Sequence, residues 1–219
     1  MYSNMSKSLI LCLLALLVCS TAAIPAAAPV RPPAGAVKVT SLDVDLDGGG
    51  CKPGEASVSI VRDNSALTII FDNFEAADGP KAGSAKSRAF CRITIGVSSP
   101  GYALDIDTVD FRGYVLLEKG VEASLVSRWK WVDKNGVDLK GKGNVQKIVQ
   151  GPFNNDVLLH KNGELSDNEP SVCQKKDAKL QISLSATVSS GTSQKNGYVQ
   201  GSAQDIGFGE TLNLSWKKC

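Results

Sequence analysis

The stretch LQISLSATV, Leu180–Val188, places apolar and polar side chains at alternate positions. Successive side chains of a β-strand point to opposite faces of the sheet, so this alternation predicts a strand with one buried and one exposed face. The same period of two recurs in LDVDL, ASVSIV, ALTII, CRITIGV, YALDIDTVDF and TLNLSW. No segment that follows the N-terminal apolar run sustains a helical period, so the sequence predicts an all-β fold.

Turn-forming dipeptides separate the predicted strands. Asn-Gly is the strongest short indication of a hairpin, because both residues tolerate the positive φ of a type I′ turn. It occurs at Asn135-Gly136, Asn162-Gly163 and Asn196-Gly197. Many short strands with glycine-containing turns are typical of an antiparallel β-sandwich or jelly roll. The composition is uniform over residues 37–219, which predicts a single domain there.

The chain begins with the features of a secretory signal peptide. Lys7 precedes an apolar run over residues 9–18 that small residues follow, so residues 1–23 are expected to be removed. A membrane span needs about 20 apolar residues, a length that no segment reaches, so none is expected. Residues 24–36, IPAAAPVRPPAGA, form a Pro/Ala-rich leader that is expected to be extended and mobile.

Cys51, Cys91, Cys173 and Cys219 remain once the signal peptide is removed. An even number of cysteines in an exported chain predicts two disulfide bonds. Three pairings are open, and we favour Cys51–Cys91 with Cys173–Cys219, which closes loops of similar size. The sequence has no C-x-x-C pair and a single histidine, so neither a zinc site nor a cofactor is expected.

The charge balance is close to neutral. The chain has 24 basic and 22 acidic side chains, and loss of Lys7 with the signal peptide lowers the formal net charge from +2 to +1. Proteins that bind nucleic acid carry a strongly basic surface for the phosphate backbone. No nucleic-acid partner is therefore expected.

Several landmarks resemble the secreted, mostly fungal proteins grouped as domain of unknown function 4360. The resemblance covers most of residues 37–190 and is strongest in VDFRGYVLLEKGV, Val109–Val121. Further matching landmarks are Gly50-Cys51, Pro53-Gly54, TIIFDNF (68–74), SRAFC (87–91), Gly151-Pro152 and Cys173. Lys52 and the WKW at 129–131 depart from the family pattern. The resemblance implies an exported, disulfide-bonded, mainly β protein and supplies no reaction, because the family's activity is not established.

The stretch SLDVDLDGGGCKPGE, Ser41–Glu55, has two interpretations. Asp43, Asp45 and Asp47 are spaced like the first ligands of an EF-hand calcium loop. However, Gly54 occupies the position of the bidentate glutamate. Apolar residues alternate with the acids, which favours a strand whose carboxylates face water, and no metal site is predicted.

A second acidic row consists of Asp105, Asp107 and Asp110. Glycoside hydrolases hold two carboxyl groups about 5–9 Å apart across a sugar, and alternate positions of a strand give roughly that spacing. Any exposed strand face carries such pairs, so we interpret the row as weak ligand candidates and assign no catalytic residue.

Trp129 and Trp131 fall on one side of a predicted strand, while Arg128 and Lys130 fall on the other. Because the basic residues should face water, the tryptophans are predicted to lie in the core and not to form a platform for sugars. His160 is the only histidine, so any hydrolase that uses an imidazole base would need it. We interpret it as a surface residue near a turn.

Arg112 lies in the stretch most similar to the family and is a further weak ligand candidate. The favoured interpretation is an arginine bound to a carboxylate at a strand end, with Gly113 marking a β-bulge. The sequon Asn213-Leu214-Ser215 makes Asn213 a candidate for glycosylation in a secreted chain.

These features predict a secreted, extracellular binding or interaction module, with no enzymatic activity favoured. Its expected partner is cell-wall polysaccharide, a host surface or another extracellular protein, an inference from compartment and fold alone. One alternative is a carbohydrate-active hydrolase or lyase on a β-sandwich that uses the acidic row. A further alternative is a secreted protease inhibitor that presents an exposed loop such as residues 78–89.

Overall fold

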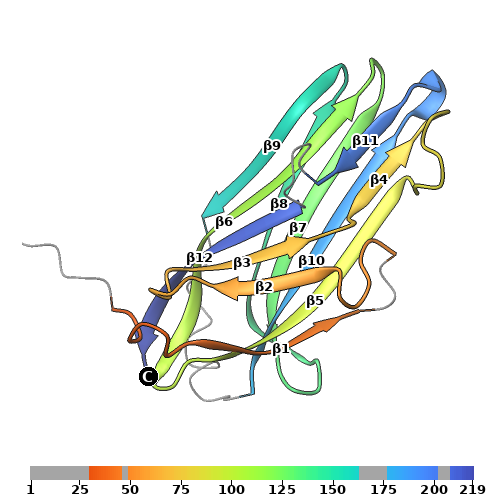
Figure 1. Ribbon diagram of the computed structural model, residues 1–219. Helices are drawn as coiled ribbons and strands as arrows, with labels where there is room; N and C mark the ends of the chain where they lie inside the picture. Colours follow the sequence, from red (N-terminus) through yellow and green to blue (C-terminus); the bar gives the residue numbers. More distant parts are fainter. Residues whose placement is uncertain (1–29, 46–48, 163–176, 202–207) are drawn as a thin grey trace, which may run out of the picture.

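The computed structural model describes residues 30–45, 49–162, 177–201 and 208–219. These residues form two antiparallel β-sheets that lie face to face (Figure 1). The predicted all-β sandwich is therefore confirmed. The expected signal peptide over residues 1–23 lies outside the described residues, as do Asp47 and Cys173.

The first sheet has five strands in the order β1-β5-β10-β7-β8. Its central strand contains the alternating stretch LQISLSATV, whose apolar residues are buried against the other sheet. The strands span β1 Lys38–Val44, β5 Arg88–Ser98, β10 Lys179–Ser189, β7 Glu122–Val132 and β8 Asp138–Gln150.

The second sheet has seven strands, with the order β2-β3-β12-β6-β11-β4 and with β9 paired to β6. The long strand β6 is its axis, because β12 and β11 share one edge of β6 while β9 pairs with the other edge. The strands span β2 Ala56–Ile60, β3 Ala66–Phe71, β12 Phe208–Lys218, β6 Tyr102–Leu117, β11 Gly197–Gln200, β4 Glu75–Asp78 and β9 Phe153–Asn162.

Aromatic rings pack in the core between the sheets. Phe208 stacks on Phe111 with 5.4 Å between ring centroids and meets the edge of Phe74 at 4.9 Å. Gly113 leaves room for this cluster, because a Cβ there would lie 2.0 Å from the Phe208 ring. The predicted β-bulge at Gly113 is wrong: the register of β6 is regular there and shifts at Asp107 instead.

Trp129 and Trp131 are buried in the core, as predicted. Gly143 on the neighbouring strand β8 accommodates the Trp129 indole, since a Cβ on Gly143 would lie 2.3 Å from that ring. The alternation of tryptophan with basic residues therefore predicted correctly which side of β7 faces inward.

The Asn-Gly dipeptides differ in what they form. Asn135-Gly136 lies in the β7–β8 hairpin, where Gly136 has a φ of +80°. Asn196-Gly197 does not connect paired strands, because β10 and β11 belong to different sheets. The hairpin prediction is wrong there: the Glu118 carboxylate accepts a hydrogen bond of 2.9 Å from the Asn196 backbone N–H and holds this segment. Asn162-Gly163 runs into residues outside the described ranges.

The predicted disulfide Cys51–Cys91 is present, with the two Cα atoms 5.3 Å apart. It joins the segment between β1 and β2 to the middle of β5, and both cysteines are buried. Cys219 is also disulfide-bonded. Its predicted partner, Cys173, lies outside the described residues.

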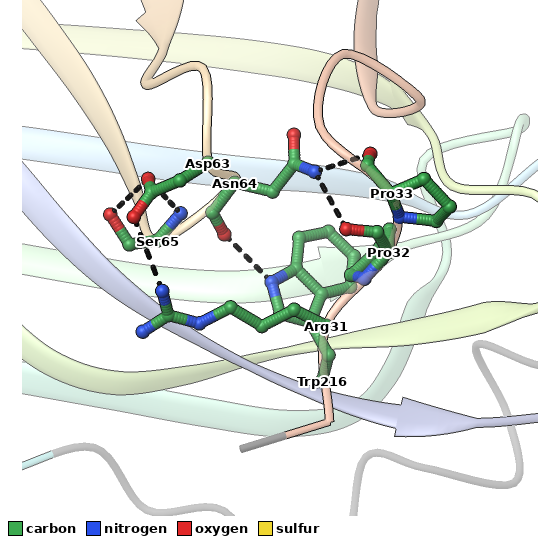
Figure 2. Close-up of polar contacts among 7 residues, drawn as sticks. All are labelled: Arg31, Pro32, Pro33, Asp63, Asn64, Ser65 and Trp216. Carbon is green, nitrogen blue, oxygen red and sulfur yellow. Dashed lines mark hydrogen bonds and ion pairs between the residues drawn. The ribbon is translucent and has the colours of Figure 1, made fainter. Parts of the chain in front are cut away.

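Residues 30–36 of the Pro/Ala-rich leader lie against the β2–β3 turn (Figure 2). The Asn64 side-chain amide donates hydrogen bonds to the carbonyls of Pro32 and Pro33 at 3.2 and 2.9 Å. The Asn64 backbone carbonyl accepts one of 2.8 Å from the Trp216 indole N–H. A single turn residue thus connects the leader to β12, although composition predicted a mobile segment.

Candidate functional site

The five-stranded sheet presents a polar and basic outer face, away from the core. Its central strand β10 places small side chains there, beginning with Ser183. Arg92 on β5 and Arg128 on β7 flank Ser183 in register. Because a short side chain lies between two long ones, the face is hollowed into a cleft of about 470 Å³. The lining residues are Arg92, Arg128, Trp129, Lys130, Lys142, Gly143, Asn144, Gln181 and Ser183.

The register of the sheet sets the spacing of the basic residues. Strands lie about 4.8 Å apart, so Arg92 and Arg128, which flank β10, are about 10 Å apart at the backbone. Arg128 pairs with Asn144, and Lys130 pairs with Lys142. Arg128 and Lys142 are therefore diagonal neighbours, whose Cα atoms are expected to lie about 7–8 Å apart. The cleft runs across β5, β10, β7 and β8, so an extended ligand would cross the strands.

Two cations of the cleft are paired with acids. Arg92 binds Asp45 at 3.0 Å, and Lys130 binds Asp138 at 2.6 Å. The Arg92 guanidinium also lies 5.2 Å from the centroid of the Phe90 ring, a cation–π geometry. These contacts hold the two side chains and compensate their charges locally.

Arg128 and Lys142 differ from those two residues. Both side chains are exposed, and neither makes an ion pair or a side-chain hydrogen bond within the described part of the chain. Their positive charges are uncompensated by any carboxylate there. The part of the cleft that lies over β7 and β8 therefore attracts negative charge.

The acidic row lies on the other sheet and is divided by the bulge in β6. Asp105 is buried with an exposed fraction of 3%, and its carboxylate accepts a hydrogen bond of 3.0 Å from the Ile106 backbone N–H. Asp107 is exposed and has no register partner on β12, while Asp110 is half-buried. The three carboxylates thus have three different environments.

The structure brings together three residues that the sequence singled out separately. Because β9 pairs with β6, His160 Nδ1 lies 2.7 Å from Asp110 Oδ1. The Asn213 side-chain amide on β12 donates to Thr108 Oγ1 at 2.7 Å and to Asp110 Oδ2 at 3.4 Å. The His160 side chain is 54% exposed, so this imidazole–carboxylate pair lies open to water, without the solvent exclusion that favours catalysis.

Arg112 is exposed on the outer side of β6, near this cluster. The predicted carboxylate partner is absent among the residues that the structure describes. Arg112 remains a candidate for contact with a ligand on the seven-stranded sheet.

The strand interpretation of the first acidic stretch is confirmed as far as Val44, because β1 covers Lys38–Val44. Asp45 follows the end of the strand, and Asp47 lies outside the described residues. Asp43 pairs with Lys179 at 3.2 Å, and Asp45 with Arg92 as described above. Over the described ranges, no group of three or more His, Cys, Asp or Glu side chains could hold a metal ion.

The loop over residues 78–89 is bound to the body of the domain. The Lys81 backbone N–H donates to the Asn196 side chain at 2.8 Å, and the Lys81 carbonyl accepts a hydrogen bond of 2.7 Å from the Tyr198 hydroxyl. A smaller hollow of about 310 Å³ lies between this loop, β4 and β11. These hydrogen bonds hold the loop to the sheet at Lys81, while Gly83, Ser84, Lys86 and Ser87 are exposed.

The two sheets and the Cys51–Cys91 bond define a disulfide-bonded β-sandwich protein. The chain belongs to the family described as domain of unknown function DUF4360, whose family model matches residues 36–219. A relative from Arthroderma benhamiae, described as an uncharacterized secreted protein, is 25% identical over 183 residues, which cover 83% of this chain and 72% of the relative. The predicted family and the predicted secretion are confirmed.

The chain also has a low similarity to several solved structures. TmCBM61, solved with β-1,4-galactotriose, is 12% identical with a TM-score of 0.28, over 82% of this chain and 90% of that one. The CBM22-1 xylan-binding domain from Paenibacillus barcinonensis is 11% identical with a TM-score of 0.27, over 85% of this chain and 99% of that one. Likeness at this level carries no argument about a ligand. Within the described residues, no helix is long and apolar enough to cross a membrane.

Proposed function

We propose that this protein is an extracellular, non-enzymatic binding module that holds a polysaccharide chain on the outer face of its five-stranded sheet. The single observation that carries the proposal is the cleft over Ser183, whose lining side chains are almost all hydroxyl, amide or cationic groups. Such groups donate and accept the hydrogen bonds that sugar hydroxyls require. An open hollow that crosses several strands fits a chain better than a compact small molecule.

Part of the lining is held in place by contacts within the protein. Gln181 on β10 donates a hydrogen bond of 3.3 Å to the Thr94 hydroxyl on β5, and Arg92 is held by Asp45 and by the Phe90 ring. Side chains held in place lose less conformational entropy when a ligand binds. The held side chains of Gln181 and Arg92 therefore lower the entropic cost of binding a ligand.

The placement of the other candidates favours binding over the two alternatives. A glycosidase needs two carboxyl groups that face each other across a sugar. Asp105 is instead buried and accepts a hydrogen bond from the Ile106 backbone. The Asp110 carboxylate is bound by His160 and Asn213. A protease inhibitor needs a loop that can enter the active site of a protease, whereas hydrogen bonds to Asn196 and Tyr198 hold this loop to the sheet at Lys81.

Co-sedimentation with insoluble polysaccharides, combined with an assay for released sugar, tests the proposal. We expect the purified protein to be retained by at least one polysaccharide without release of sugar. Release of sugar would establish an enzyme, and absence of retention on every polysaccharide would contradict the proposed function.

A pair of matched variants locates the binding face. Ser183→Tyr fills the floor of the cleft and should abolish retention. Thr211→Tyr places the same side chain on the outer side of β12, in the opposite sheet, and should leave retention unchanged. Equal retention by both variants would show that the ligand binds elsewhere.

A further inference from the structure

On the basis of that proposed function, we infer that the bound polysaccharide is anionic and that Arg128 and Lys142 bind its acidic groups. The four cations of the cleft differ in whether a carboxylate compensates their charge. Arg92 and Lys130 are compensated by Asp45 and Asp138. Arg128 and Lys142 are exposed and unpaired among the described residues.

The two unpaired cations are placed to act together. They lie on the adjacent strands β7 and β8 and project to the same side of the sheet, with Asn144 and Lys130 completing the two register pairs. The backbone positions of two such diagonal neighbours lie about 7–8 Å apart, a spacing similar to the Debye length of about 8 Å at physiological salt. Their fields therefore overlap, and one acidic group between them, or one beside each, is favoured.

The chemistry of the two side chains explains a preference for acidic groups. Arginine binds a carboxylate or sulfate through two parallel N–H donors, while lysine supplies a compact, mobile charge. The neutral floor of Ser183 and Gln181, next to these cations, is suited to sugar hydroxyls. A polymer that carries both hydroxyl and acidic groups matches the whole lining.

A nucleic acid is a poorer match for the same surface. Binding of its backbone requires many uncompensated cations, one for each phosphate contacted. Two cations of this cleft are already neutralised by Asp45 and Asp138, which would repel further phosphates. The pattern of local charge therefore favours a polymer whose charge density is lower than that of a nucleic acid. A polysaccharide with scattered acidic groups is such a polymer.

The test compares three soluble polymers by affinity electrophoresis and calorimetry: a polygalacturonate, a sulfated galactan and a neutral galactan. We expect at least one of the two acidic polymers to bind at least tenfold more tightly than the neutral one, with affinity that falls as salt is added. Comparison of the polyuronate with the sulfated chain distinguishes carboxylate from sulfate as the acidic group.

The variants separate site-specific binding from general attraction. The double variant Arg128→Gln/Lys142→Gln should lose at least tenfold in affinity for the acidic polymer. The control Lys52→Gln/Lys119→Gln removes the same number of charges from exposed positions outside the cleft and should bind like the wild type. Circular dichroism confirms that both double variants are folded.

Each outcome decides between the two proposals. Tight binding of the neutral galactan that is unaffected by Arg128→Gln/Lys142→Gln overturns this inference and leaves the proposed function intact. Equal losses in both double variants overturn the inference in favour of non-specific attraction. Failure to bind any polysaccharide, in this assay and in co-sedimentation, overturns the proposed function itself.

Discussion

Glu210 on β12 accepts a hydrogen bond of 2.8 Å from the Ser127 hydroxyl on β7, so the two sheets are joined by a polar contact through the core. Both residues are completely buried. Burial raises the pKa of Glu210 to about 7, against the opposing effect of the Ser127 hydrogen bond. The other carboxyl oxygen, Oε2, has no hydrogen-bond partner among the residues that the structure describes. A neutral, protonated carboxyl suits such a site better than a carboxylate.

The first prediction is that the protein is more stable in mild acid than at neutral pH. The pKa of Glu210 is about 7 in the folded state and 4.5 ordinarily, so between these values the folded state keeps a proton that the unfolded state releases. Rising pH then favours unfolding, by about 3 kcal/mol at most from this group, and the effect levels off above pH 7. Urea denaturation from about pH 5 to about pH 8 measures this slope.

Two variants isolate the contribution of Glu210. Glu210→Gln should flatten the pH dependence, whatever its effect on absolute stability, because glutamine does not titrate. Glu122→Gln, at an exposed position of β7, should keep the wild-type slope. Hydrogen bonds lower the pKa values of Asp63, Asp78 and Glu118, so the stability from these groups is lost only as the pH falls below about 4–5, outside this window. A slope that survives in Glu210→Gln would assign the effect to another group.

The second prediction concerns the donor of the same hydrogen bond. Ser127→Ala leaves the buried Glu210 carboxyl without its donor and should lower the free energy of unfolding by about 1–3 kcal/mol. Ser124→Ala removes a half-buried hydroxyl on the outer face of the same strand and should change stability by less than about 0.5 kcal/mol. Chemical denaturation of both variants makes the comparison, and equal small effects would show that the contact contributes little.

The third prediction concerns the leader. Asn64 has a φ of +58°, a conformation that favours asparagine and glycine, and its amide holds the carbonyls of Pro32 and Pro33 (Figure 2). Asn64→Gly keeps the backbone conformation but removes the amide, so the leader should detach. Hydrogen exchange at Gly35 and Ala36, whose N–H groups bond to nearby carbonyls, should then become faster.

A matched substitution separates the amide from the backbone. Asn64→Ala removes the same hydrogen bonds and also forces alanine into a positive φ, at a further cost of about 1–2 kcal/mol. It should therefore be less stable than Asn64→Gly. If exchange at Gly35 and Ala36 is unchanged in both variants, the Asn64 amide does not hold the leader.

The fourth prediction is that Asn213 is unmodified in the native protein. Its amide is half-buried in a central strand and donates to Thr108 and Asp110, and a glycan on the same nitrogen would remove at least one of these hydrogen bonds. Intact mass measurement of the secreted protein should show no N-linked glycan. A glycan mapped to Asn213 by peptide mass spectrometry would contradict this.

Much of the fold is predictable because the alternation of apolar and polar residues along a strand indicates which side chains are buried. The stretch Leu180–Val188 indicates its own buried face, and Trp129 and Trp131 indicate the inner face of β7. The hairpin prediction for Asn196-Gly197 was wrong because a dipeptide indicates only the local backbone conformation. The position of this segment depends on a hydrogen bond to Glu118, which is distant in sequence.

The candidate site is less predictable because it depends on which strands are neighbours. Arg128 was predicted to face water, but its place beside Ser183 and Asn144 follows from pairing between strands distant in sequence. The contact of His160 with Asp110 has the same origin, since β9 pairs with β6. Composition gives no indication of such pairings. The one local sign of the cleft is the row of small polar residues in LQISLSATV.

The central claim is that a polysaccharide binds across the outer face of the five-stranded sheet. Titration of isotope-labelled protein with an acidic oligosaccharide, followed by amide chemical shifts, tests it most directly. We predict that the largest shifts map to Arg128, Asn144 and Ser183, on neighbouring strands of that face. Shifts confined to the opposite sheet around Asp110 and His160, or no shifts at any accessible concentration, would contradict the claim.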